Sequence, residues 1–98
     1  MAEYILLMHG DEIGTVQDGL WGPYLQKLRD GGHFRGGSAI GSGECARKSG
    51  AMPQITKHLS GFIRIEADSL SQARASLVGN PTFEAGGTVE IRELPRTD

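Results

Sequence analysis

The sequence predicts an α+β domain of the ferredoxin-like class, in which a four-stranded antiparallel sheet and two helices follow the order βαββαβ. Two observations carry this prediction. Residues 4–8 form a continuous apolar run, and apolar and polar residues alternate over 61–67 and 88–92. Amphipathic helical patterns lie between these segments. At 98 residues the chain is long enough for a single domain, which we assign to 1–98.

The first third of the chain predicts one strand followed by one helix. Tyr4–Met8 is apolar at every position, which is typical of a strand buried on both faces. Apolar residues then recur at helical spacing until Gly31-Gly32 ends the pattern. Pro23 is compatible with a helix only near its first turn. The expected apolar stripe of this helix consists of Leu20, Trp21, Tyr24, Leu25 and Leu28.

A glycine-rich stretch predicts the second strand, from Phe34 to about Cys45. Strict alternation would place Phe34, Ser38, Ile40 and Ser42 on the same side of it. The glycines allow the strand to bend, and they allow another backbone or a ligand to approach closely. Residues 46–53 are expected to form a connection.

Local signals in the second half are clearer. The third strand, 61–67, alternates regularly between apolar and polar residues. Ser69 and Gln72 have the spacing of a capping box, which predicts that a helix begins there, and Gly79-Asn80-Pro81 predicts its end. The last strand is expected over 88–92.

Both helices of this fold cover the same face of the sheet, so the opposite face is left open. A mixed apolar and charged face of this kind is typical of a dimer interface or a pocket. We therefore expect a homodimer in which two sheets meet face to face. The residues expected on the open face from the last two strands are Phe62, Arg64, Glu66, Glu90 and Arg92.

Composition and charge argue against several classes of protein. The net charge is −2, the pI is about 5.9 and there is no basic stripe, so nucleic acid is not an expected partner. The apolar run 4–8 is too short for a signal peptide or a membrane span. We therefore expect a cytoplasmic protein without a membrane partner. The single Cys45 permits no internal disulfide.

The sequence predicts neither a cofactor nor a metal. Gly41–Ala46 fits the G-x-G-x-x-A pattern of a dinucleotide-binding turn, but Gly50 and Pro53 follow too soon for the helix that this motif must open. The three histidines are isolated in sequence, without the H-x-x-x-H or H-E-x-x-H spacing of a zinc site.

Some residues are nevertheless candidates for a functional site. His9 and Asp11 follow the first strand, where the carboxylate could orient the imidazole for acid–base catalysis or simply form a loop pair. His58 is a further candidate base. Trp21 and Tyr24 fit either core packing or the wall of a pocket. The candidate ligand-binding residues are Trp21, Tyr24, Ser38, His58, Phe62 and Arg64.

Four segments of the second half resemble the YCII-related family, in the branch known for a D-G-P-F motif. They are Thr56–Phe62, Ala67–Ala73, Asn80-Pro81 and Gly86–Leu94, which read TKHLSGF, ADSLSQA, NP and GGTVEIREL. The first strand also fits this family. The D-G-P-F motif itself is absent, and His58 stands where the family usually has glutamate.

The resemblance implies a dimeric α+β barrel. Most of the family has no assigned activity, and one lineage is a dehydrochlorinase that uses a histidine on the first helix with a nearby aspartate. Trp21 occupies the matching helix position here, so that catalytic pair is not carried over. Two functions remain. One is a homodimeric module that binds a small aromatic or carboxylic ligand between the sheet and the first helix. The other is a lyase or hydrolase that uses His9, His33 or His58 as general base.

Overall fold

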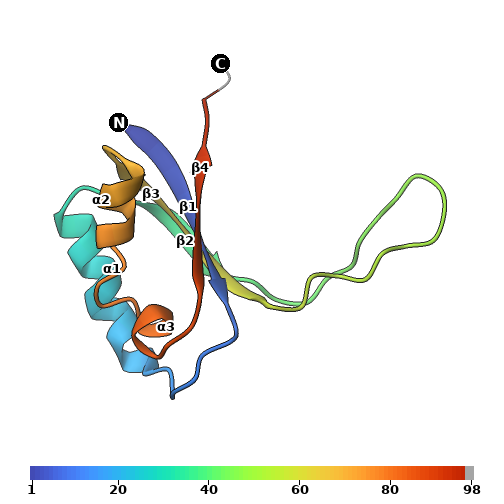
Figure 1. The fold of residues 1–98 in the computed structure, drawn as a ribbon, viewed down its shortest axis with the longest axis horizontal. Helices are drawn as coiled ribbons and strands as arrows, with labels where there is room; N and C mark the ends of the chain where they lie inside the picture. The colour runs from blue at the N-terminus through green and yellow to red at the C-terminus, as the bar shows by residue number, and fades with distance from the viewer. Residues whose placement is uncertain (97–98) are drawn as a thin grey trace.

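The computed structural model describes residues 1–96, which form a four-stranded antiparallel sheet in the order β2-β3-β1-β4 (Figure 1). The chain thus has the predicted α+β architecture and roughly the predicted βαββαβ order. A short 3-10 turn, Asp18–Leu20, precedes the first helix. The elements are β1 (Ala2–His9), α1 (Trp21–Asp30), β2 (Phe34–Ala39), β3 (Leu59–Ala67), α2 (Leu70–Ala75), α3 (Pro81–Glu84) and β4 (Val89–Leu94).

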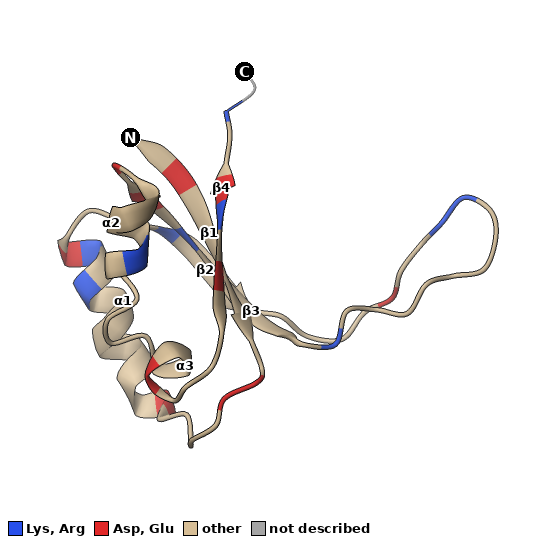
Figure 2. Ribbon diagram, in the orientation of Figure 1, with Lys and Arg blue, Asp and Glu red and all other residues tan. Residues whose placement is uncertain are grey.

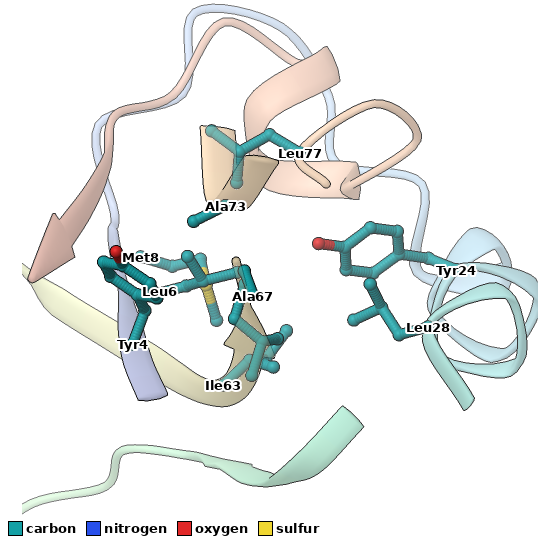
Figure 3. Packing of buried hydrophobic residues seen from close by; sticks show 10 residues of the cluster. Tyr4, Leu6, Met8, Tyr24, Leu28, Ile63, Ala67, Ala73 and Leu77 are labelled. Atoms are coloured by element: carbon teal, nitrogen blue, oxygen red, sulfur yellow. The ribbon is translucent and has the colours of Figure 1, made fainter. Parts of the chain in front are cut away.

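The core lies between the sheet and the helices, which all cover one face (Figures 1 and 3). Because side chains of a strand alternate between faces, Tyr4, Leu6 and Met8 of β1 point into this core and are buried. Ile5 and Leu7 point to the open face and are only half-buried. The chain alone therefore buries one face of β1, where its apolar run predicted two. The core residues are Tyr4, Leu6, Met8, Tyr24, Leu28, Ile63, Ile65, Ala67, Ala73 and Leu77.

Helix α1 begins at Trp21, so Pro23 falls in its first turn as expected. Tyr24 and Leu28 are the buried residues of its apolar stripe, whereas Leu20 lies in the preceding turn and is 44% exposed. The hydroxyl of Tyr24 donates a hydrogen bond to the backbone oxygen of Ser76 at 3.0 Å. This bond ties α1 to the end of α2.

The predicted Ser69 cap is present at the start of α2, but the reciprocal bond reaches the residue before the cap rather than the cap residue itself. The hydroxyl of Ser69 accepts a hydrogen bond from the backbone amide of Gln72, and the Gln72 side chain accepts one from the amide of Asp68. Helix α2 ends at Ala75, before the predicted stop at Gly79-Asn80-Pro81, and a short helix, α3, begins at Pro81, where only a helix end was predicted. Asn80 caps α3 by accepting from the amide of Phe83, and Pro81 occupies its first turn.

The second strand differs from its prediction in length and in orientation. It ends at Ala39 rather than near Cys45. A β-bulge at Gly36, whose φ is +123°, shifts the alternation by one residue. Phe34, Gly37 and Ala39 therefore lie on the helix side, while Ser38 pairs with Phe62 on the open side. The expectation that Phe34 and Ser38 share a side is wrong because strict alternation cannot pass through a bulge.

Residues 40–58 form a long exposed arm between β2 and β3, which extends away from the rest of the chain (Figure 1). Near its tip the Arg47 side chain donates a hydrogen bond to the backbone oxygen of Ala51 at 3.0 Å. Segment 41–46 lies on this arm, and the next helix begins only at Leu70. The dinucleotide pattern therefore lacks its helix, as the sequence predicted.

The glycines of β2 permit a close approach by the neighbouring strand. A Cβ atom placed on Gly37 would lie 2.6 Å from the backbone oxygen of Phe62 and 3.1 Å from the Cα atom of Ile63. The backbone that approaches the glycine-rich stretch is therefore that of β3 in the same chain.

Among residues 1–96, no helix is long and apolar enough to span a membrane.

We predict that Gly37→Ala lowers the free energy of unfolding by about 1–3 kcal/mol, because the added methyl forces β2 and β3 apart. Urea denaturation of the purified variant measures this loss. Gly41→Ala is the matched control, since nothing lies within 4 Å of its added Cβ. Equal stability of the two variants would show that the close contact at Gly37 is not required.

Candidate functional site

A largely apolar cavity of about 460 Å³ lies between the sheet, the start of α1 and the loop that precedes α1. Trp21 lines it from the helix. Its volume is within the range of small-molecule sites in proteins. The other apolar lining residues are Met8, Val16, Leu25, Phe34, Ala39, Phe62 and Ile63.

Small residues of the sheet create this space. Gly37 and Ala39 of β2 and Gly61 of β3 lie on the helix side of the sheet, opposite the first turn of α1. None of them can fill the gap below Trp21. One and two turns further along the helix, the large side chains of Tyr24 and Leu28 are buried in the core.

The polar lining of the cavity is sparse, and its charged groups are all acidic. Glu12 and Asp18 contribute carboxylates, and Ser38, Ser60 and Thr82 are the remaining polar residues. No lysine, arginine or histidine lines the cavity. A few polar groups on an apolar wall are typical of a site that orients a small ligand.

Three of the six predicted ligand-binding residues border this cavity: Trp21 of α1, and Ser38 and Phe62 from strand positions whose side chains lie on the open face. Tyr24 belongs to the core instead: it is 3% exposed, and burial raises the pKa of its hydroxyl above the usual 10. Arg64 lies on the open face, where its guanidinium pairs with Glu3 at 2.9 Å. His58 is exposed and also lies outside the cavity lining.

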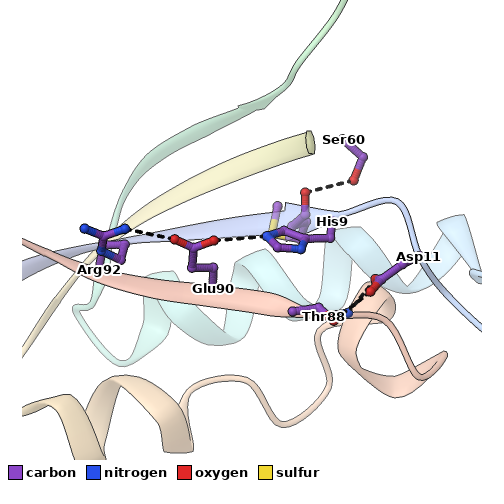
Figure 4. A network of polar contacts seen from close by, with 7 residues as sticks. His9, Asp11, Ser60, Thr88, Glu90 and Arg92 are labelled. Carbon is purple, nitrogen blue, oxygen red and sulfur yellow. Dashed lines mark hydrogen bonds and ion pairs between the residues drawn. The ribbon is translucent and has the colours of Figure 1, made fainter. Parts of the chain in front are cut away.

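A second cluster of polar side chains occupies the open face (Figure 4). The Nε2 atom of His9 donates to a carboxylate oxygen of Glu90 at 3.2 Å, and Arg92 donates to the other oxygen at 3.0 Å. The bond from Arg92, followed by that from His9, holds the pKa of Glu90 below its usual range. The His58 ring packs edge-on against His9 with ring centres 4.7 Å apart. The cluster therefore joins an imidazole to an ionised carboxylate.

The carboxylate beside His9 is thus Glu90 rather than Asp11. Asp11 accepts hydrogen bonds from the backbone amide of Thr88 at 2.8 Å and from its hydroxyl at 2.7 Å. These two bonds lower the pKa of Asp11 below its usual value. Asp11 accordingly anchors the loop after β1 to the start of β4.

The remaining histidine, His33, and the single cysteine, Cys45, lie outside the cavity lining. His33 donates from Nδ1 to the backbone oxygen of Glu66 at 2.8 Å, which joins the turn after α1 to β3. Cys45 is a free thiol on the arm. Within residues 1–96, no group of three or more potential ligands is placed to hold a metal ion.

Sequence reasoning missed Glu12, Asp18 and Ala39 as lining residues, because the loop and the bulge that position them have no sequence signature. Glu90 could have been found. In the ferredoxin-like plan the last strand lies antiparallel to the first, which brings His9 at the end of the first strand close to Glu90 near the start of the last. The chain matches no protein-family model and shows no significant similarity to a curated protein.

We predict that Thr88→Val raises the pKa of Asp11 towards its usual value, because the variant keeps the amide donor but loses the hydroxyl donor. A carboxyl group whose pKa is lower in the folded state stabilises the protein at neutral pH, and this contribution is lost as the pH falls through the folded pKa. The stability difference between variant and wild type should therefore shrink in acid.

Carboxyl ¹³C NMR titration measures the shift. Thr88→Ser is the matched control, since it retains the hydroxyl donor and should keep the low pKa. If the Thr88→Val and Thr88→Ser variants give the same pKa for Asp11, the hydroxyl bond is not what lowers that pKa.

Proposed function

We propose that this protein is a small-molecule-binding module whose site is the cavity between the sheet and the first helix. The observation that carries the proposal is the combination of about 460 Å³ of largely apolar space with a few polar groups at its wall. Trp21 supplies a broad apolar surface for a ring system. Of the two ligand classes expected from the sequence, an aromatic ligand has the clearer support.

We further propose that the module is a homodimer in which the two sheets face one another, as the resemblance to the YCII-related family implies. Ile5, Leu7 and Phe62 form an apolar centre on the open face and are half-buried in the single chain. Ion pairs such as Arg64–Glu3 and Arg92–Glu90 surround this centre. An apolar centre with a charged rim is the usual composition of a protein interface. A second sheet would also bury the outer face of β1, in keeping with its apolar sequence.

A second candidate function is that of a lyase or hydrolase, and the observation that favours it is the His9–Glu90 pair. A carboxylate that fixes the orientation of an imidazole is a common arrangement for a general base. Glu90 lies opposite Leu7 on the open face, so a substrate would have to bind on the opposite side of the sheet from the cavity. The two candidate functions therefore concern different surfaces.

We predict that Ala39→Phe abolishes binding of small aromatic compounds to the cavity, because the added ring projects from the edge strand into the space. Isothermal titration with 3-methylindole measures the loss. Ile40→Phe is the matched control. It introduces the same phenylalanine ring at the next position, and Ile40 does not line the cavity.

Binding should survive in the Ile40→Phe variant. Equal binding by both variants would place the aromatic site elsewhere. An activity that depends on His9 and survives Ala39→Phe would favour the second candidate function.

We predict that Leu7→Lys converts the homodimer to a monomer, because it places two buried charges near the centre of the sheet-to-sheet interface. Light scattering coupled to size-exclusion chromatography measures the mass. Val78→Lys is the control, since Val78 is 60% exposed and follows α2 on the helix side. A monomeric wild type at micromolar concentration would contradict the dimer.

A further inference from the structure

We propose that the cavity selects ligands that carry a protonated amine on an apolar or aromatic body, and that it discriminates against carboxylates. This inference rests on the proposed function and assigns the charge of its ligand. The two charged residues of the lining are Glu12 and Asp18, and both carry a carboxyl group.

The two carboxylates have no partner among residues 1–96, since neither side chain there takes part in an ion pair or a side-chain hydrogen bond. By contrast, the carboxylates of Glu3 and Glu66 are paired with arginines, at 2.9 and 2.8 Å. Figure 2 shows acidic segments, and no basic ones, around α3 and the start of α1. The charge at the cavity is therefore not neutralised by neighbouring cations.

The loop that carries Glu12 is anchored rather than loose. The backbone amides of Ile13 and Gly14 both donate to the oxygen of Ala85, at 3.1 and 2.9 Å. The Cγ atom of Glu12 lies so close to Gly87 that a Cβ atom there would be 2.9 Å away. The stem of this side chain is thus packed before a ligand arrives, which reduces the entropy lost on binding.

An amine and a carboxylate would meet opposite conditions in this cavity. An ammonium group is attracted by Glu12 and Asp18, and the aromatic face of Trp21 is a further favourable contact for a cation. A ligand carboxylate would be repelled by the same two residues and would find no cationic side chain in the lining. Glu12 is half-buried, so its charge is screened less by water than a fully exposed charge, whereas Asp18 is exposed.

Three probes with the same indole ring test the proposal: tryptamine, which is cationic, 3-methylindole, which is neutral, and indole-3-acetate, which is anionic. Isothermal titration at low salt should give the tightest binding for tryptamine and the weakest for indole-3-acetate. Two partly exposed charges predict a ratio of dissociation constants of about tenfold between these two probes. Added salt should reduce this ratio.

The double variant Glu12→Gln/Asp18→Asn should remove the preference, so that the ratio of the dissociation constants of indole-3-acetate and tryptamine falls towards one. Glu44→Gln/Asp68→Asn is the matched control, because it changes the net charge equally at residues outside the cavity lining. A preference that is lost equally in both double variants would reflect the overall charge and would overturn the assignment to Glu12 and Asp18.

The remaining outcomes separate this inference from the proposed function. If 3-methylindole binds in the cavity but tryptamine binds no tighter than indole-3-acetate, the charge selection is wrong and the binding function stands. If none of the three probes binds to the wild-type protein, both proposals are overturned.

Discussion

The arrangement of this protein depends on one constraint: a central apolar strand whose two faces have different surroundings. β1 lies between β3 and β4, and the helices cover only one side of the sheet. Because the side chains alternate, Leu6 and Met8 enter a closed core, while Leu7 and His9 reach the open face. Both candidate sites follow from this division, since one lies on each side of the same strand.

The cavity is a consequence of how the sheet edge is built. β2 can approach β3 closely only because Gly37 lacks a side chain at the contact. The same absence leaves space under the first turn of α1, where Trp21 forms the opposite wall. Larger residues at Gly37 or Ala39 would extend the core and close the cavity. The packing that would favour stability and the space that a ligand needs are therefore in conflict here.

Elements with strong local signals were predictable from the sequence, and those set by tertiary contacts were not. Alternation placed β3 correctly, and the spacing of Ser69 and Gln72 located the start of α2. The bulge at Gly36 could not be read from composition, because glycine also permits ordinary extended backbone. It reversed the expected orientation of Ser38. The acidic wall of the cavity depends on a loop held by backbone bonds, which leave no pattern in the sequence.

The adjacent positions Met8 and His9 show why the two surfaces can be studied separately. Met8 lines the cavity, whereas His9 bonds to Glu90 on the open face. A ligand bound on one side and a partner bound on the other would touch alternate residues of one strand without sharing a side chain. Variants on the helix side would therefore test the proposed ligand binding, and variants on the open side would test the proposed association or acid–base chemistry. The sheet separates the helix-side surface from the open-face surface.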